Sequence, residues 1–463
     1  MIRLCKYNQD SVLDKVKKGK LDAVALSTSN LIDDIILEMN KLKVLDCLKD
    51  NIPDLRAKNT TIPYNLIWAS AIVAKMKVQT SLTDIPFAIN NHKTLAELGY
   101  TIIDTEGNLK NGLMQESSLR FLLGKYNPDL FINGYNDTVQ KSIFPLLDIS
   151  PDIHILDCTE IEVNFDNENY EQAGIWHDRR DDSKIRGYKL ATLRGIVEDT
   201  GLIEEIRFGS INTHDLTLSK EMVMTSPILK PSDILINDRG FISRDLINYL
   251  KTYKEVDTYI PLRTDMDAYD QAVSIAKEQN NWKIHPNPKR KGQMISFVPE
   301  VGAYWRSKQP DDDVPINSCV LWIKDTDSYS VFITTDLSAT AVDIVRTYEL
   351  RPEIEEDYRQ LKDFWKIEDF KSTKLNVILF HIVCVLFGYL FFQLYTLSPE
   401  GAKYLHKSLP VILKSYMPEV HPYVVLYTGY EFGVLTLFEL MELYAQSSDQ
   451  TKKQFESILN KRT

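Results

Sequence analysis

Residues 154–163 read HILDCTEIEV, and here the sequence changes from a helical to a strand-like pattern. Apolar and β-branched residues favour an extended strand, and a carboxylate, Asp157, stands inside the apolar run. Two more strand-like runs follow at 188–197 and 202–208, separated by an Asp-Thr-Gly turn at 199–201. The stretch therefore predicts the first of three consecutive strands joined by short turns.

The next segment alternates helix and strand patterns. Helix patterns cover 215–224 and 243–253, and strand patterns cover 233–238 and 256–262. Ser243 is a suitable N-cap for the second helix. Three strands followed by helix, strand, helix and strand favour a mixed α/β sheet.

Residues 263–336 depart from this alternation. Turns rich in Pro, Asn and Asp occur at 285–288 and 309–313. Strand-like pieces lie at 294–298, 319–324 and 329–334. We therefore expect a β-rich insertion in this part of the chain.

The segment before residue 145 shows helical spacing of its apolar residues, which predicts an all-α N-terminal domain. Its lysine-rich segment 15–20 suits contact with DNA ends, and the domain suits dimerisation or packing equally well. Residues 377–392 are almost wholly apolar, but His381 interrupts a window already short for a membrane span. We expect a buried helix there, followed by an α-helical C-terminal region.

Residues 348–362 read YELRPEIEEDYRQLK. If this segment is one helix, Tyr348, Arg351, Glu355 and Lys362 fall within about 60° of one another. A carboxylate flanked by two cations suits a metal ion held beside phosphates. An exposed helix with an ordinary Arg351–Glu355 ion pair is the alternative interpretation.

Other acidic residues compete with Glu355 for the same role. Around a helix, the nearest competitors lie about 100° or more from it, so only one carboxylate can face Arg351. Pro352 is favoured in a first helical turn, and a helix starting there would leave Tyr348 and Arg351 on the lead-in segment. The competing residues are Glu353, Glu356 and Asp357.

The spacing Y-x2-R-x3-E-x6-K resembles the signature of bacterial insertion-sequence transposases of the DDE class, in the group founded on insertion sequence four. Asp157-Cys158-Thr159 resembles the D-x-T strand of that family, and residues 237–241, NDRGF, resemble its D-x-G-[FY] turn. The resemblance spans about 153–363 and selects Glu355 as the third carboxylate. It implies an α/β fold with a ribonuclease-H-like mixed sheet core.

The resemblance and the patterning together give a domain plan. We expect a helical N-terminal domain at 1–145, a catalytic core at 150–262 that resumes at 337–400, a β-rich insertion at 263–336 and a helical region at 401–463.

The resemblance also implies a chemistry. Asp157, Asp238 and Glu355 would be the catalytic residues and would hold two Mg²⁺ ions, for which Mn²⁺ can substitute. Tyr348, Arg351 and Lys362 would contact DNA phosphates. The implied function is cleavage at transposon terminal inverted repeats and strand transfer to target DNA. A homodimer on paired ends is expected. A ribonuclease-H-fold nuclease without strand transfer and a non-catalytic, domesticated DNA-binding transposase are the alternatives.

The formal net charge of −11 argues against indiscriminate nucleic-acid binding. Local basic clusters at 179–194 and 283–308 weaken that objection. The β-rich insertion contains three tryptophans that suit stacking on an unpaired base or, alternatively, packing in the core. Five widely separated cysteines without metal-ligand spacing indicate a reducing, cytoplasmic location without a zinc site. The tryptophans are Trp282, Trp305 and Trp322. The basic candidates for DNA contact are Lys189, Arg239, Lys289, Arg290 and Lys291.

Overall fold

The computed structural model describes most of the chain, in two compact units. The described residues are 5–27, 30–58, 60, 62–100, 103, 114–177, 182–301, 313–415 and 423–460. The core unit is Val139–Gln360, and the outer unit combines Met1–Thr138 with Leu361–Thr463. Each unit is described separately below.

Five strands form the centre of the core unit in the order β6-β5-β3-β7-β8. β3 is antiparallel to β5, and β5 is antiparallel to β6, whereas β3, β7 and β8 run parallel. This is the order and direction of a ribonuclease-H-like sheet, so the predicted mixed α/β core is confirmed. The strands are β3 (Ile153–Val163), β5 (Lys184–Val197), β6 (Thr200–Ser210), β7 (Ile234–Asn237) and β8 (Asp257–Pro261).

Local sequence explains these elements. β5 and β6 are joined by Glu198 and Asp199, which both have positive φ angles, 48° and 61°, as a tight two-residue hairpin turn requires. Helices α9 (Asp215–Thr225) and α10 (Arg244–Lys254) follow β6 and β7. The Ser243 side chain caps α10, as predicted, by accepting a hydrogen bond from the Leu246 backbone N–H.

The expected insertion is rich in strands and extends the core sheet. β12 pairs antiparallel with β8, and β11, β10 and β9 continue the sheet outward. Helix α11 (Asp267–Gln279), which the sequence analysis did not predict, contributes Ala268, Ala272 and Ala276 to the apolar core. The added strands are β9 (Lys283–Ile284), β10 (Gln293–Val298), β11 (Asn317–Ile323) and β12 (Ser328–Thr334), and β4 (Gly174–His177) pairs with β5.

The remaining helices of the core unit precede and follow the sheet. A π-helix at Thr138–Ile143 and α8 (Phe144–Leu147) lead into β3. Helices α12 (Ala341–Tyr348) and α13 (Pro352–Asp363) follow β12, and α13 runs to the division between the two units.

A buried histidine joins three strands of the core unit at the start of β3. His154 is fully buried, with Nδ1 2.7 Å from Glu204 Oε2 and Nε2 3.2 Å from Asp233 Oδ2. Burial alone would lower the pKa of the imidazole, but the two carboxylates outweigh burial and raise the pKa to about 9. Their attraction therefore stabilises a charged histidine inside the protein.

Because the pKa of His154 is about 9 in the folded protein and about 6.5 when unfolded, its contribution is complete below pH 6.5 and is lost as pH rises through 9. We expect the free energy of unfolding to fall by about 3 kcal/mol across that window. Urea unfolding between pH 6 and 10 measures the change. In His154→Gln the free energy of unfolding should no longer fall across this pH range. The half-exposed control His177→Ala should show the same fall as the wild type. The same fall in His154→Gln would contradict the assignment.

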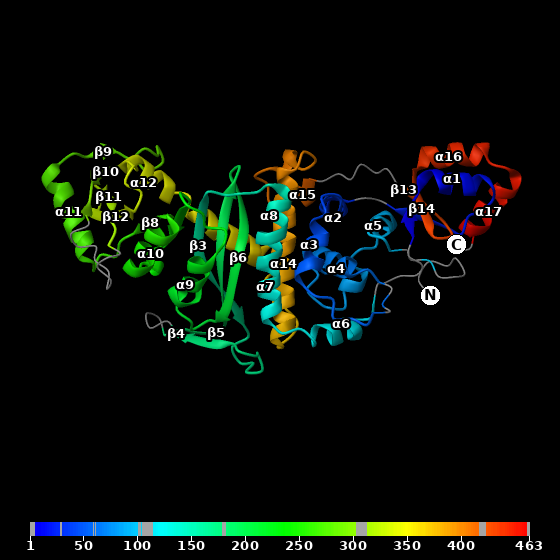
Figure 1. Ribbon diagram of the computed structural model, residues 1–463, viewed down its shortest axis with the longest axis horizontal. Helices are drawn as coiled ribbons and strands as arrows, with labels where there is room; N and C mark the ends of the chain where they lie inside the picture. Colours follow the sequence, from blue (N-terminus) through cyan, green and yellow to red (C-terminus); the bar gives the residue numbers. More distant parts are fainter. Residues whose placement is uncertain are drawn as a thin grey trace. The chain divides into compact units, whose positions relative to one another are not determined.

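The two ends of the chain form one small sheet in the outer unit, blue and red in Figure 1, with strand order β1-β14-β13-β2. The predictions of an all-α N-terminal domain and an α-helical C-terminal region are therefore wrong. The short strand β2 pairs with β13, about 400 residues later, so nothing local signals it. The strands are β1 (Lys6–Tyr7), β2 (Ala23–Ser27), β13 (Tyr423–Thr428) and β14 (Glu431–Thr436).

Three helices complete this terminal subdomain. They bury Val12, Leu443 and Phe455 against the sheet in one apolar cluster. The helices are α1 (Gln9–Lys17), α16 (Leu437–Gln446) and α17 (Asp449–Asn460).

The rest of the outer unit is helical and is built around α14 (Leu375–Leu397). In the part of the chain that the structure describes, α14 alone has the length and mean hydropathy, 2.3, of a membrane span, and 94% of that window is buried inside the protein. It is thus the buried helix that the sequence predicted. The other helices are α2 (Leu31–Lys41), α3 (Val44–Asn51), α4 (Tyr64–Met76), α5 (His92–Glu97), α6 (Glu116–Leu123), α7 (Asp129–Asp137) and α15 (Leu409–Ser415), with short 3₁₀ turns at Ile85–Phe87 and Ala402–Tyr404.

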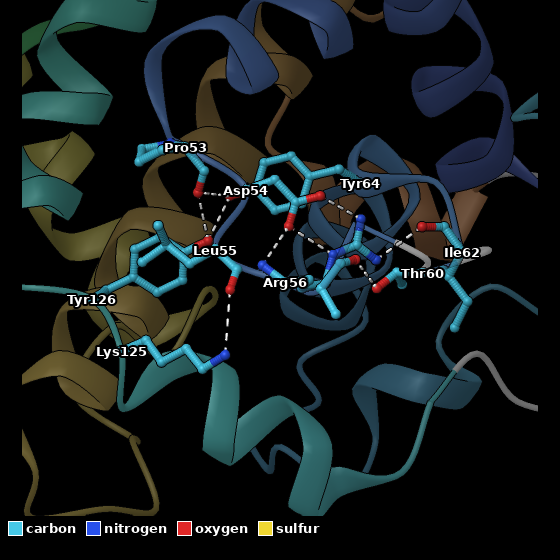
Figure 2. A network of polar contacts seen from close by, with 10 residues as sticks. Pro53, Asp54, Leu55, Arg56, Thr60, Ile62, Tyr64, Lys125 and Tyr126 are labelled. Carbon is cyan, nitrogen blue, oxygen red and sulfur yellow. Dashed lines mark hydrogen bonds and ion pairs between the residues drawn. The ribbon is translucent and has the colours of Figure 1, made fainter.

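A polar network fixes the loop between α3 and α4 (Figure 2). The hydroxyls of Tyr64 and Tyr126 both donate to the Pro53 carbonyl, at 3.1 and 2.8 Å. Arg56 donates through Nε and Nη2 to the two oxygens of Asp54, at 2.8 and 2.7 Å. These bonds join the loop to Tyr64 and Tyr126 and fix Arg56 beside Asp54, so the loop has a defined structure.

Candidate active site

Three carboxylates of the core unit meet around the guanidinium group of Arg351. Arg351 Nη2 lies 2.8 Å from Asp157 Oδ2 and 3.9 Å from Asp238 Oδ2. Arg351 Nη1 forms an ion pair with Glu355. The structure thus brings together three acidic residues that are widely separated in the sequence, all within reach of one positive charge.

Parallel pairing places the two aspartates at the same edge of the sheet. Leu156 of β3 pairs with Asn237, the last residue of β7, and the two carboxylates belong to the next residues, Asp157 within β3 and Asp238 directly after β7. Asp157 Oδ1 accepts a hydrogen bond from the Cys158 backbone N–H at 2.8 Å. Asp238 Oδ1 accepts from the Arg239 backbone N–H at 2.7 Å, which opens a 3₁₀ turn at Arg239–Phe241. Both side chains therefore have fixed directions.

Glu355 comes from the first turn of α13, which begins at Pro352. The single helix considered for 348–362 is wrong, because α12 ends at Tyr348 and Arg351 lies in the connecting turn. A proline lacks the N–H that an interior helical position needs, so it starts a helix instead of continuing one. The ring of Tyr348 packs on Phe332, with centroids 4.7 Å apart.

Burial dominates the electrostatics of this cluster. It raises the pKa of Asp157 to about 6 despite the nearby Arg351, and the charges of Asp238 and Asp215 act in the same direction. Burial also raises the pKa of Tyr348 to about 12. For Arg351 burial alone would lower the pKa, but the surrounding carboxylates raise it. The cluster therefore holds excess negative charge that a cation stabilises.

The competing acidic residues of α13 are engaged elsewhere. Glu353 and Asp357 form ion pairs with Arg194 of β5, at 3.1 and 2.5 Å. Glu356 forms an ion pair with Arg359 at 2.6 Å. Among these neighbours, Glu355 is the carboxylate that meets Arg351, as the spacing selected.

The sequence profile of the family described as "Transposase DDE domain" matches residues 149–391, more than half of the chain. The chain belongs to the transposase DDE domain family. The matched region begins just before β3 and includes the sheet and all three carboxylates. No curated protein matches this DDE transposase significantly.

The basic candidates of this DDE transposase lie in different settings. Lys189 Nζ is bonded to Asp215 Oδ1 at 2.6 Å and to the Thr213 carbonyl at 2.8 Å, so it is already neutralised. Arg290 lies 3.3 Å from Glu349, the C-cap residue of α12, which is two residues before Arg351. This ion pair holds the basic turn 289–291 beside the active-site segment. Lys289, Lys291 and Arg239 are exposed, and Lys362 forms an ion pair with Glu368 at 3.1 Å.

The tryptophan candidates for base stacking also lie in different settings. Trp282 and Trp322 are half-buried and pack against each other, with ring centroids 5.2 Å apart. Trp282 also packs against the apolar core of the transposase, which is a structural role. Trp305 lies outside the described residues, as do four basic members of the two clusters, Arg179, Arg180, Arg306 and Lys308.

Two site neighbours were missed by sequence reasoning. Asp215 opens α9 and is close enough to Asp157 to raise its pKa. Arg194 anchors α13 through Asp357. A helix-opening acid after a strand was a usable signal for Asp215, but the partners of Arg194 are about 160 residues away and give no local pattern.

The donor set fits a hard divalent cation, although no ready-made set of three metal ligands occurs among the described residues. Three carboxylates supply the oxygen atoms that Mg²⁺ and Mn²⁺ prefer. Arg351 lies between them, and its positive charge pairs with all three carboxylates. The three negative charges therefore favour a cation, and Arg351 occupies the position between them.

Proposed function

We propose that this DDE transposase catalyses cut-and-paste DNA transposition. It would cleave DNA at the terminal inverted repeats of its element and join the ends to target DNA. The observation that carries the proposal is the convergence of Asp157, Asp238 and Glu355 on one positive charge at the edge of a ribonuclease-H-like sheet. Membership of the family supports the same reaction class.

In this proposal Asp157, Asp238 and Glu355 hold Mg²⁺, or Mn²⁺ in its place. When bound, the metal activates water or a DNA 3′-hydroxyl and stabilises the departing oxygen. The protein fixes two carboxylates on neighbouring parallel strands and the third on a helix, so that all three oxygen donors face one point. This rigid placement supplies the orientation that phosphoryl transfer needs.

Arg351 has a second task in the proposal. A metal ion held by Asp157, Asp238 and Glu355 would compete with the guanidinium for these carboxylates and would free Arg351 from Asp157 and Glu355. The freed side chain lies beside the metal site, where a bidentate guanidinium suits a DNA phosphate. Tyr348, three residues before it in the chain, and Lys362 are proposed to contact phosphates as well. These contacts position the DNA and do not read its sequence.

The turn 289–291 is proposed as part of the DNA-binding surface, because the Arg290–Glu349 ion pair holds it beside the active-site segment. Arg239 is proposed as a further contact. Lys189 is proposed as well, but it would have to leave its ion pair with Asp215 to contact DNA. Lys289→Ala and Lys291→Ala should each reduce the slope of log K against log salt concentration by about 1, the value for one lost phosphate contact. Fluorescence anisotropy with terminal-repeat DNA at several KCl concentrations measures the slope. The exposed control Lys220→Ala on α9 should leave the slope unchanged. Equal slopes for all three variants would show that the turn is not part of the DNA-binding surface.

A strand-transfer assay with pre-cut terminal-repeat DNA tests the proposed function directly. Joined product that depends on Mg²⁺ and on Asp157 is expected. Cleavage of intact substrate without any joined product would instead indicate a nuclease of the same fold. We further propose that the protein acts in the bacterial cytoplasm, at the nucleoid, as a homodimer that pairs two DNA ends.

A further inference from the structure

We propose that Arg194 is a positioning residue that sets the rotation of α13 about its axis and so determines where Glu355 points. The inference rests on the proposed role of Glu355 as a metal ligand. Arg194 contacts neither the aspartates of the site nor Glu355 in any bond described above. It acts through its neighbours on α13.

Arg194 and Asp157 project from the same face of the core sheet. Thr192 of β5 lies directly opposite Asp157 of β3, and Arg194 is two residues further along β5. Side chains two residues apart in a strand point to the same face, so Asp157, Thr192 and Arg194 share one face. Helix α13 packs on that face.

Two polar contacts attach α13 to this face. Arg194 Nε lies 2.5 Å from Asp357 Oδ2, and both side chains are buried, with exposures of 4% and 8%. The hydroxyls of Thr192 and Tyr358 form a buried hydrogen bond at 2.7 Å. A buried charge is costly unless it is paired, so α13 cannot turn without breaking contacts that the interior requires.

Asp357 and Tyr358, which make the two contacts, lie on opposite sides of the buried face of α13. Measured around the helix from Glu355, Tyr358 lies about 60° to one side, and Asp357 lies about 160° away in the same direction. The buried side chain of Ile354 falls between them. Because both sides are attached, a rotation by one residue, about 100°, is excluded, and Glu355 stays at the edge of the buried face.

A glycine makes room for this arrangement. A Cβ atom at Gly201 of β6 would lie 2.1 Å from Arg194 Nε and 2.2 Å from its Cζ. No side chain fits there while the guanidinium keeps its position. Gly201→Ala therefore displaces Arg194 without changing any residue of α13 or of the metal site.

The test measures Mg²⁺ binding to the full chain without DNA, by titration calorimetry. Arg194→Met should weaken Mg²⁺ binding about tenfold, the lower end of the effect of losing a group that orients a metal ligand. Gly201→Ala should weaken binding in the same direction. Lys251→Met is the matched control, because it breaks a half-buried Lys251–Asp257 ion pair in the same unit, away from α13, and should leave binding unchanged.

A double-mutant cycle separates positioning from general destabilisation. If Arg194 acts through Glu355, Arg194→Met should cause no further loss of Mg²⁺ affinity in a Glu355→Gln background. Additive losses would overturn the inference, and so would unchanged binding in Arg194→Met. If thermal melting shows that Arg194→Met does not fold, Asp357→Asn, which keeps the size of the side chain, replaces it in the cycle. A wild-type protein that neither binds Mg²⁺ nor cleaves DNA would instead overturn the proposed function.

Discussion

Asp157→Asn, Asp238→Asn and Glu355→Gln should each reduce Mg²⁺-dependent cleavage of terminal-repeat DNA by about a thousandfold or more. Each substitution keeps the size of the side chain but removes one anionic metal ligand. Bound metal lowers the barrier to phosphoryl transfer by several kcal/mol, and about 4 kcal/mol corresponds to a thousandfold in rate. The cleavage rate on a labelled terminal repeat measures the effect.

Binding of the repeat should remain measurable in all three variants, because the proposed phosphate contacts come from other residues. Glu356→Gln is the matched control, since Glu356 lies next to Glu355 but pairs with Arg359. Near-normal cleavage in any one of the three variants would remove that residue from the metal site. A loss of cleavage in Glu356→Gln equal to that in Glu355→Gln would show that the third ligand was assigned wrongly.

Arg351→Gln should change metal binding and cleavage in opposite directions. Without DNA, the guanidinium competes with Mg²⁺ for the carboxylates, so its removal should tighten Mg²⁺ binding about tenfold, or about 1.4 kcal/mol. Cleavage should fall about a hundredfold or more, because a donor aimed at the reacting phosphate is lost. Calorimetry and the cleavage assay together measure the two effects.

Stability provides a third measurement for the same variant. Removing one partner of a largely buried ion pair costs about 3 kcal/mol, so metal-free Arg351→Gln should unfold more readily than the wild type. Saturating Mg²⁺ should restore much of that loss, because the metal supplies the missing positive charge. Weaker Mg²⁺ binding in Arg351→Gln would contradict the competition between arginine and metal.

Local patterning predicted the core of the fold well. The alternation around Asp157 and the Ser243 cap are short-range signals, and the structure contains both of them. The turn between the second and third strands was predicted at 199–201, but the structure turns at Glu198 and Asp199 and includes Thr200 and Gly201 in β6. Neighbouring parallel strands then bring Asp157 and Asp238 to one edge. The spacing selected Glu355, and the structure shows that Glu355 forms an ion pair with Arg351.

Features that depend on distant partners were not predictable in the same way. Strand β2 is five residues long and is stabilised by β13, near the other end of the chain. Arg194 is a strand residue whose importance depends on Asp357, far along the sequence. A helix start at Pro352 was predictable, since proline favours the first turn of a helix. The contact of Arg351 with the carboxylates was not predictable from the sequence, because it depends on the fold of the connecting turn.

The most direct test of the metal site is an anomalous difference map from crystals of the full-length protein grown with Mn²⁺. A peak is expected among Asp157, Asp238 and Glu355, with Arg351 turned out of the cluster. Mn²⁺ absent from this position at a concentration that supports cleavage, with Arg351 still bound to the carboxylates, would contradict the account.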